Sequence, residues 1–308
     1  MKRAVSISIG SSKRDKAVQI DLLGEKVQIE RIGTDGDLEQ AAKMYGDLDG
    51  HVDAFGVGGA DLGLLIDYHW YPLYSVRPMV RFVKKTPLVD GGGLKITLER
   101  KVAQVLESKI GGYLDKVGRR AFVTVGSDRW GMLSSFAAAG YPLTFGDMLF
   151  TLNIPITLHS PQSVRRLAAI LMPIAGRLPF KWVYPTGKDQ EKRTPKGQAM
   201  FDWGTIIAGD CLYIIRYMPD RLEGKVIVTN TTTEADVRQF REAGVKYLMT
   251  TTPVLDGRSF GTNMMEAAII AASGRTKPVD YAHPGHYLEE LEQLLPRLNF
   301  EPQVQELN

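Results

Sequence analysis

The chain has 308 residues, with 44% hydrophobic and 24% charged residues, the proportions of an ordinary globular protein of about two domains. The formal net charge of +3 is too small to indicate a nucleic-acid partner, and no apolar run is long enough to predict a transmembrane helix. The one cysteine, Cys211, excludes a disulfide framework within this sequence. Its apolar neighbours predict a buried thiol, and a cytoplasmic location is expected.

Residues 1–115 predict an N-terminal α/β domain, which we expect to hold the substrate. An alternating strand comes first, followed by a hairpin, a helix with an Asp N-cap, two short strands and a longer helix. These elements are expected at residues 4–9, 19–23 with 26–32, 37–48, 52–57, 86–89 and 96–110. Gly111-Gly112 ends the last helix and predicts the domain boundary.

Residues 116–275 predict a Rossmann-like, doubly wound parallel sheet, because short apolar strands alternate with helical segments. The expected strands are residues 121–125, a short strand after Gly140, 225–228 and 247–249, and the expected helices include 148–152, 234–243 and 263–272. Residues 276–308 predict a helix at 287–298 and a polar tail that dock on the body. The predicted fold class is therefore α/β, with two α/β domains.

A glycine-containing turn follows the strand at 121–125. Gly126 and Gly131 occupy the first and third glycine places of G-x-G-x-x-G, and Asp128 stands at the second. Asp147 follows Gly126 by 21 residues, where a ribose-binding carboxylate is expected. We expect the turn to bind a nucleotide phosphate at the helix N-terminus, with Ser127 and Arg129 assisting. The alternative is that Asp128 and Asp147 are helix N-caps.

A polar loop follows the strand at 225–228, at the carboxyl edge where α/β sheets bind ligands. Asn230, Thr231 and Thr232 offer hydroxyl and amide groups for phosphate, ribose or a polyhydroxylated substrate. Helix capping by Thr232 or Thr233 is the alternative explanation of these residues.

A second polar loop is expected to bind substrate. Asp256 is a candidate general base, and Arg258 can hold a carboxylate or phosphate. Ser259, Thr262 and Asn263 add hydrogen-bonding side chains on the same loop.

A third candidate site follows the strand at 86–89. Lys95 comes after three glycines and is a candidate acid/base, with Asp90 or Asp256 as its partner. The alternative is a solvated lysine on a flexible loop. No metal site is expected, because His283 and His286 have no carboxylate or cysteine close by in the sequence.

The order of these features resembles the quinate/shikimate 5-dehydrogenase group of bacterial proteins. The resemblance rests on the N-terminal α/β domain, on the stretch Val123-TVGSDRWG and on the strand-loop Val226-IVTNTTT. It implies a nicotinamide cofactor beside the loop that ends Val226-IVTNTTT, and it implies a catalytic lysine-aspartate pair. Asp128 departs from the family's glycine-rich turn, and Gly146-Asp147-Met148 stands in place of the arginine motif that selects NADP.

The sequence thus predicts an oxidoreductase that moves a hydride between NAD and an alcohol or ketone of a small polar metabolite. NADP is less expected, since Asp147 would repel a 2′-phosphate. One alternative is a non-catalytic protein that binds a nucleotide or anionic metabolite on the same fold. Another is an enzyme that processes a sugar or phosphate at the 256–263 loop without a cofactor. The expected partner is a small molecule, with a homodimer left open, and neither nucleic acid nor membrane is expected.

Overall fold

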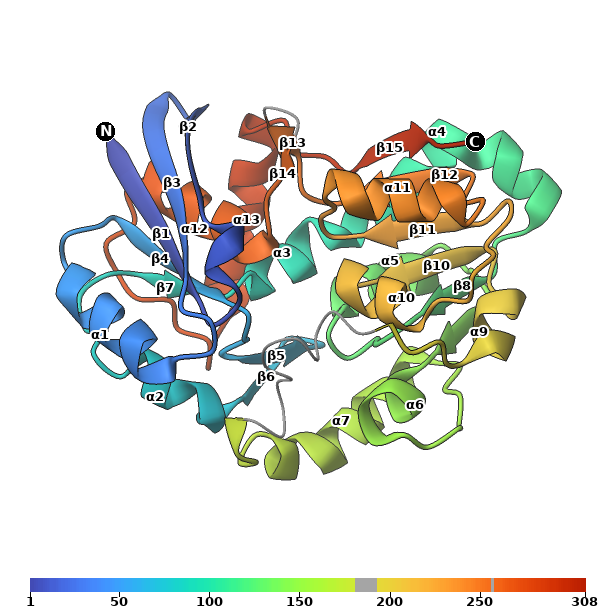
Figure 1. Ribbon diagram of the computed structural model, residues 1–308, viewed down its shortest axis with the longest axis horizontal. Coiled ribbons are helices and arrows are strands. Elements are labelled where there is room, and N and C mark those ends of the chain that lie inside the picture. The colour runs from blue at the N-terminus through green and yellow to red at the C-terminus, as the bar shows by residue number, and fades with distance from the viewer. Residues whose placement is uncertain (181–192, 256–257) are drawn as a thin grey trace. The chain divides into compact units, whose positions relative to one another are not determined.

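The computed structural model describes residues 1–180, 193–255 and 258–308, without the side chains of residues 254–259. This chain divides into two compact units (Figure 1). Unit 1 holds Met1–Leu94, a stretch that starts at Ile170, and Gly261–Asn299. Unit 2 holds Lys95–Ala169, a stretch that ends at Phe260, and Phe300–Asn308. The units thus interleave along the chain, whereas the sequence predicts the consecutive parts 1–115, 116–275 and 276–308.

Unit 1 is built on a five-stranded sheet in the order β2-β3-β1-β4-β7. The strands are β1 (Lys2–Ser8), β2 (Lys16–Leu22), β3 (Glu25–Gly33), β4 (Ala54–Gly58) and β7 (Leu88–Val89). Strand β1 pairs in parallel with both β3 and β4, and β2 with β3 forms the predicted antiparallel hairpin. The chain passes from β1 to β2 and β3 on one side and then crosses to β4 on the other, so the strand order reverses between β1 and β4.

The helices of unit 1 follow the sequence signals closely. Helix α1 (Leu38–Leu48) begins after Asp37, whose side chain accepts a hydrogen bond from the Gln40 amide, so the predicted N-cap is confirmed. Helix α12 (Thr262–Ser273) packs on β1, β3 and β4. The predicted C-terminal helix is α13 (Gly285–Arg297). Smaller elements are β5 (Gly63–Ile66), β6 (His69–Pro72), η1 (Ser12–Arg14), η2 (Tyr74–Val76) and α2 (Arg77–Val80).

Unit 2 is built on a six-stranded sheet in the order β15-β12-β11-β10-β8-β9 (Figure 1). The strands are β8 (Ala121–Val123), β9 (Leu143–Phe145), β10 (Ile206–Gly209), β11 (Val226–Thr229), β12 (Tyr247–Thr250) and β15 (Gln303–Glu306). The first five are parallel and β15 is antiparallel to β12. The predicted doubly wound parallel sheet is confirmed. Its strand order, 2-1-3-4-5, places the switch point between β8 and β10.

Helices and short pairs complete unit 2. A helical segment that opens in unit 1 as α3 (Gly92–Thr97) continues through the 3₁₀ turn η3 (Glu99–Lys101) into α4 (Val102–Val117). The helices after the strands are α5 (Trp130–Ala138), α6 (Asp147–Leu152), α9 (Gln198–Trp203), α10 (Cys211–Tyr217) and α11 (Glu234–Glu242). Helix α7 (Pro161–Ala175) contributes residues to both units, and β13 (Val254–Leu255) pairs with β14 (Arg258–Ser259).

Two strands of the six-stranded sheet of unit 2 are absent from the sequence prediction. Strand β10 has four buried residues and no alternation, so its short apolar run gives no period to detect. Strand β15 is polar and mostly exposed, because it lies at the edge of the sheet and gains its place from pairing with β12. Neither strand carries a local signal strong enough to be recognised.

Gly131, in the first turn of α5, permits a close backbone contact. A Cβ atom at this position would overlap the carbonyl oxygen of Lys95. We predict that Gly131→Ala lowers the free energy of unfolding by about 1–3 kcal/mol, because a backbone atom cannot move aside as a side chain can. Gly112→Ala in α4 is the matched control: its Cβ meets nothing within 4 Å, and the better helix propensity of alanine should leave stability unchanged or slightly raised. Urea denaturation checks both, and equal effects would contradict the packing role of Gly131.

Candidate functional site

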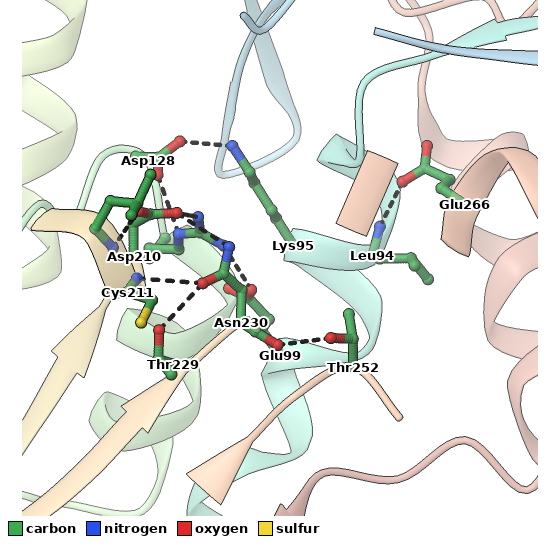
Figure 2. Close-up of polar contacts among 12 residues, drawn as sticks. Leu94, Lys95, Glu99, Asp128, Asp210, Cys211, Thr229, Asn230, Thr252 and Glu266 are labelled. Carbon is green, nitrogen blue, oxygen red and sulfur yellow. Dashed lines mark hydrogen bonds and ion pairs between the residues drawn. The ribbon is translucent and has the colours of Figure 1, made fainter. Parts of the chain in front are cut away.

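The candidate site lies at the switch point of unit 2, where the carboxyl ends of β8, β10 and β11 adjoin. Residues 124–129 follow β8, Asp210 follows β10, and Asn230 follows β11. Open α/β sheets bind ligands at this place, because the two neighbouring loops turn to opposite faces and leave a crevice. Charged side chains of these loops meet those of the segment that begins at Lys95 (Figure 2).

Arg129 is the centre of the charge cluster. Its side chain is 3% exposed, and it lies immediately before α5. Nη1 donates to Glu99 Oε1 at 2.8 Å, and Nη2 donates to Asp210 Oδ2 at 2.8 Å. Nε forms an ion pair with Asp128 Oδ2 at 3.0 Å. One buried guanidinium thus holds three carboxylates that come from three different parts of the chain.

Lys95 and Asp128 form the second strong interaction of the site. Lys95 Nζ donates to Asp128 Oδ1 at 2.7 Å, with side chains 11% and 25% exposed. Burial by itself would raise the pKa of Asp128, but the charges of Lys95 and Arg129 outweigh it and lower the pKa to about 2. Asp128 is therefore ionised at neutral pH. The residue that departs from the glycine motif is the partner of the predicted acid/base lysine.

Glu99 is a member of the cluster that the sequence analysis missed. Its side chain is fully buried, and Oε2 has no hydrogen-bond partner among the described residues. Burial raises the pKa of Glu99 to about 7, against the opposing charges of Arg129 and Lys95. A glutamate inside a predicted helix gives no functional signal by itself. Its position four residues after Lys95, on the same helical face, is the one clue in the sequence.

Asp210 and Asn230 complete the cluster on the side of β10 and β11. Asp210 caps α10, since Oδ1 accepts from the Leu212 amide, while Oδ2 accepts from Asn230 Nδ2 at 3.0 Å. Asn230 Oδ1 accepts from the Cys211 amide. Asn230 therefore orients Asp210, which remains 27% exposed. The threonine next to this loop, Thr233, forms a capping box with Asp236, as its alternative explanation predicts.

The glycine turn has its amides engaged within the chain. The Gly126 and Ser127 amides donate to the two carboxylate oxygens of Asp147, each at 2.8 Å. Asp147 is buried, and α6 begins at this residue without a side-chain cap, so the carboxylate serves the turn and not the helix. Burial raises the pKa of Asp147, while hydrogen bonds from Ser127 and Gly126 oppose the rise. A phosphate bound to these amides would have to displace Asp147.

Unit 1 contains a separate buried acidic pair. Asp90 accepts from the amides of Leu62 and Gly92, at 2.7 and 2.9 Å. Glu266 on α12 accepts from the Leu94 amide at 2.9 Å (Figure 2). It also accepts from the Tyr287 hydroxyl at 2.6 Å. Burial raises the pKa of Glu266 to about 8, and the charge of Asp90 adds to the rise. The carboxylate of Asp90 thus holds the backbone of its own unit.

The other predicted site residues lie in several places. Thr231 and Thr232 are half-buried after β11, in unit 2. Thr262 and Asn263 begin α12 in unit 1, where Asn263 Nδ2 donates to Ser6 Oγ at 2.7 Å. Asp256 lies outside the described residues. Arg258 and Ser259 form β14, but their side chains lie outside the described part of the chain.

The described residues contain neither a cluster of metal ligands nor a membrane helix. No three His, Cys, Asp or Glu side chains gather there in a set that would hold a metal ion. Among the helices of residues 1–180, 193–255 and 258–308, none combines the length and the apolar composition that a membrane span requires.

Comparison with known families divides the chain close to Asp90. Residues 93–307 match the family described as domain of unknown function (DUF8754). The chain belongs to this family. Residues 3–90 match a second description, domain of unknown function (DUF8753), so the two matches meet within the Asp90-Gly-Gly-Gly segment.

Neither family description names an activity, and the other comparisons add no argument about function. A comparison with curated proteins finds no match. A crystal structure from Mycobacterium smegmatis, in complex with Beta-D-Fucofuranose, aligns over 100% of both chains at 10% identity, with a TM-score of 0.31. A score this low carries no argument about the fold or the ligand of this chain.

Asp147 should contribute measurably to stability through the turn. Asp147→Ala leaves the buried Gly126 amide and the Ser127 amide without their acceptor, so we predict a loss of about 1–3 kcal/mol in the free energy of unfolding. Asp147→Asn keeps one carbonyl acceptor and should lose less. Chemical denaturation gives both values. An alanine variant as stable as the parent would show that water replaces the carboxylate without cost.

The two buried glutamates should make stability depend on pH. Their pKa values, raised to about 7 and about 8, mean that the folded state binds protons more tightly than the unfolded state. The resulting stabilisation is complete below the unfolded pKa near 4.5 and is lost as pH rises through 7 and 8. For Glu99 it is on the order of 3 kcal/mol.

Single variants separate the two contributions. Glu266→Gln should reduce the fall in unfolding free energy between pH 7 and 8. Glu99→Gln should leave the fall between pH 7 and 8 as it is and reduce the fall below pH 7. Urea denaturation at half-unit pH steps measures the slopes. Identical slopes in the parent and both variants would contradict the raised pKa values.

Proposed function

We propose that the chain is an enzyme of small polar metabolites, with its site at the carboxyl edge of the unit 2 sheet and Lys95 as the acid/base. The buried ion pair between Lys95 and Asp128 supports this proposal. An ammonium group held by an ionised carboxylate can donate a proton to a hydroxyl or carbonyl oxygen of a bound ligand, and accept it back. Arg129 fixes Asp128 from its other side, so the pair keeps one geometry.

The exposed groups of the site favour hydroxyl groups of the ligand over phosphate. Arg129 is buried and engaged by three carboxylates, and the Gly126 and Ser127 amides bind Asp147. The carboxylates of Asp128 and Asp210 are each about one quarter exposed. Carboxylate oxygens accept hydrogen bonds from hydroxyl donors and repel anions. We infer that a polyhydroxylated part of the ligand lies beside Lys95.

A second candidate is the NAD-dependent oxidation of an alcohol, which the resemblance to quinate/shikimate dehydrogenases implies. The Lys95–Asp128 pair favours it, because that resemblance implies a lysine-aspartate pair. The glycine turn does not fit a pyrophosphate held in the usual way, since its amides bind Asp147 and the space above Gly131 is filled by the Lys95 carbonyl. The acid/base chemistry proposed for Lys95 therefore needs no dinucleotide. The same site in a metabolite-binding protein without catalysis is the remaining alternative.

We place this activity in the cytoplasm as part of the same proposal. Cys211 is a buried thiol, and a chain with a single cysteine has no intrachain disulfide to gain from an oxidising compartment.

Ligand binding and turnover test the proposal with defined probes. Quinate, shikimate and myo-inositol are titrated by calorimetry, and proton NMR follows conversion of each with and without NAD⁺. We expect at least one probe to bind and to be converted. Lys95→Met should lower turnover at least about 100-fold while binding falls far less, because the lysine acts mainly on the transferred proton. Lys116→Met, an exposed lysine of α4, is the matched control.

The outcomes separate the candidates. Conversion that needs NAD⁺, together with saturable quenching of NADH fluorescence, would select the oxidoreductase. No saturable NADH signal at millimolar concentration would remove it. Binding without conversion of any probe, unchanged in Lys95→Met, would favour the non-catalytic protein and overturn the assignment of Lys95.

A further inference from the structure

Glu99 lies on the same helical segment as Lys95, the lysine of the Lys95–Asp128 ion pair. Leu98 keeps right-handed helical geometry between α3 and η3, so Glu99 lies one turn after Lys95. In such a segment residues four apart lie on one face. Glu99 is fully buried, whereas Asp128 and Asp210 remain partly exposed. Glu99 therefore belongs to the cluster without reaching its exposed side.

The contacts of Glu99 leave room for a proton. Oε1 accepts from Arg129 Nη1, and Oε2 has no hydrogen-bond partner among the described residues. An ionised carboxylate that is completely buried normally has both oxygens satisfied, because its charge is costly away from water. A proton on Oε2 removes that charge while Oε1 keeps its bond to Arg129.

The charges of the cluster give this proton a role. Lys95 and Arg129 are positive, and Asp128, Asp210 and ionised Glu99 are negative, so two cations face three anions. If Lys95 gives its proton to a ligand while Glu99 stays ionised, the negative excess grows by one. Protonation of Glu99 restores the starting balance.

We propose that Glu99 is a positioning residue that takes up a proton from solvent when Lys95 gives its own to the ligand. In this step an N–H bond of Lys95 breaks and an O–H bond forms on the ligand, while Glu99 Oε2 gains a solvent proton. On the return step Lys95 recovers its proton and Glu99 releases one to solvent. The total charge of the cluster stays constant, and Arg129 keeps its contacts throughout. This inference rests on the proposed function of Lys95.

The electrostatic causes of the Glu99 pKa agree with this coupling. Burial raises this pKa to about 7, the charges of Arg129 and Lys95 lower it, and the charge of Asp128 raises it. Loss of the Lys95 charge must therefore raise the pKa of Glu99 further, which drives proton uptake at neutral pH. Loss of the Asp128 charge must lower it. Asp210 acts on Glu99 through their shared partner Arg129.

Infrared difference spectroscopy across pH 5–9 tests the inference without any ligand. The full chain should show a carbonyl stretch of a protonated carboxylic acid that titrates near pH 7, disappears in Glu99→Gln and persists in the matched control Glu266→Gln. Lys95→Met should move the midpoint upward, and Asp128→Asn should move it downward, each by about half a pH unit or more. Circular dichroism verifies that every variant is folded.

Opposite shifts in the two variants would support the inference, because proton uptake by Glu99 in answer to the charge of Lys95 requires that the two sites be electrostatically coupled with these signs. Absence of a band that depends on Glu99, or a midpoint unmoved by Lys95→Met, would overturn it. If Lys95→Met does not fold, the downward shift in Asp128→Asn decides alone. If the proposed function fails, the turnover assay shows no conversion by the parent chain. The infrared shifts do not depend on that result.

Discussion

The site depends on one buried guanidinium. Arg129 holds Glu99, Asp128 and Asp210, which belong to a helical segment, to the turn after β8 and to the loop after β10. A buried charge is tolerated when it is paired and hydrogen-bonded, and all three carboxylates share this one cation. Removal of Arg129 would leave three carboxylates facing Lys95 alone. Arg129 therefore holds the loops after β8 and β10 in place and, through Asp128, also positions Lys95.

The glycine-containing turn serves the interior of unit 2. Its residues match two glycine places of a dinucleotide motif. In the structure, however, the amides of Gly126 and Ser127 bind Asp147, and Gly131 leaves space for the backbone of Lys95. The carboxylate occupies the place that a phosphate takes in the motif. The same residues that indicate nucleotide binding by spacing thus bring the acid/base lysine close to the sheet.

Much of the fold follows from local patterns. The hairpin β2–β3, the capped helix α1 and the capping box at Thr233 are all predicted, because turn residues and caps act over a few positions. The strand β10 is missed because four buried residues have no period, and β15 because pairing with β12 makes it a strand. In the site, Lys95 and Asp128 are both noticed, but their ion pair joins residues 33 positions apart. For Glu99 the sequence offers only its spacing from Lys95, and its burial beside Arg129 is what distinguishes it.

The sequence by itself determines that this is an α/β chain with a doubly wound sheet and polar loops at strand ends, because hydrophobic period and turn chemistry are local properties. It also marks Lys95, Asp128 and Asp147 as unusual. Only the tertiary structure decides what each carboxylate binds: Asp128 a lysine and an arginine, Asp147 two amides, Asp210 an arginine and an asparagine. The physical reason is that pairing and burial depend on which strands lie side by side, and the strand order places β10 next to β8 although more than 80 residues separate Arg129 from Asp210.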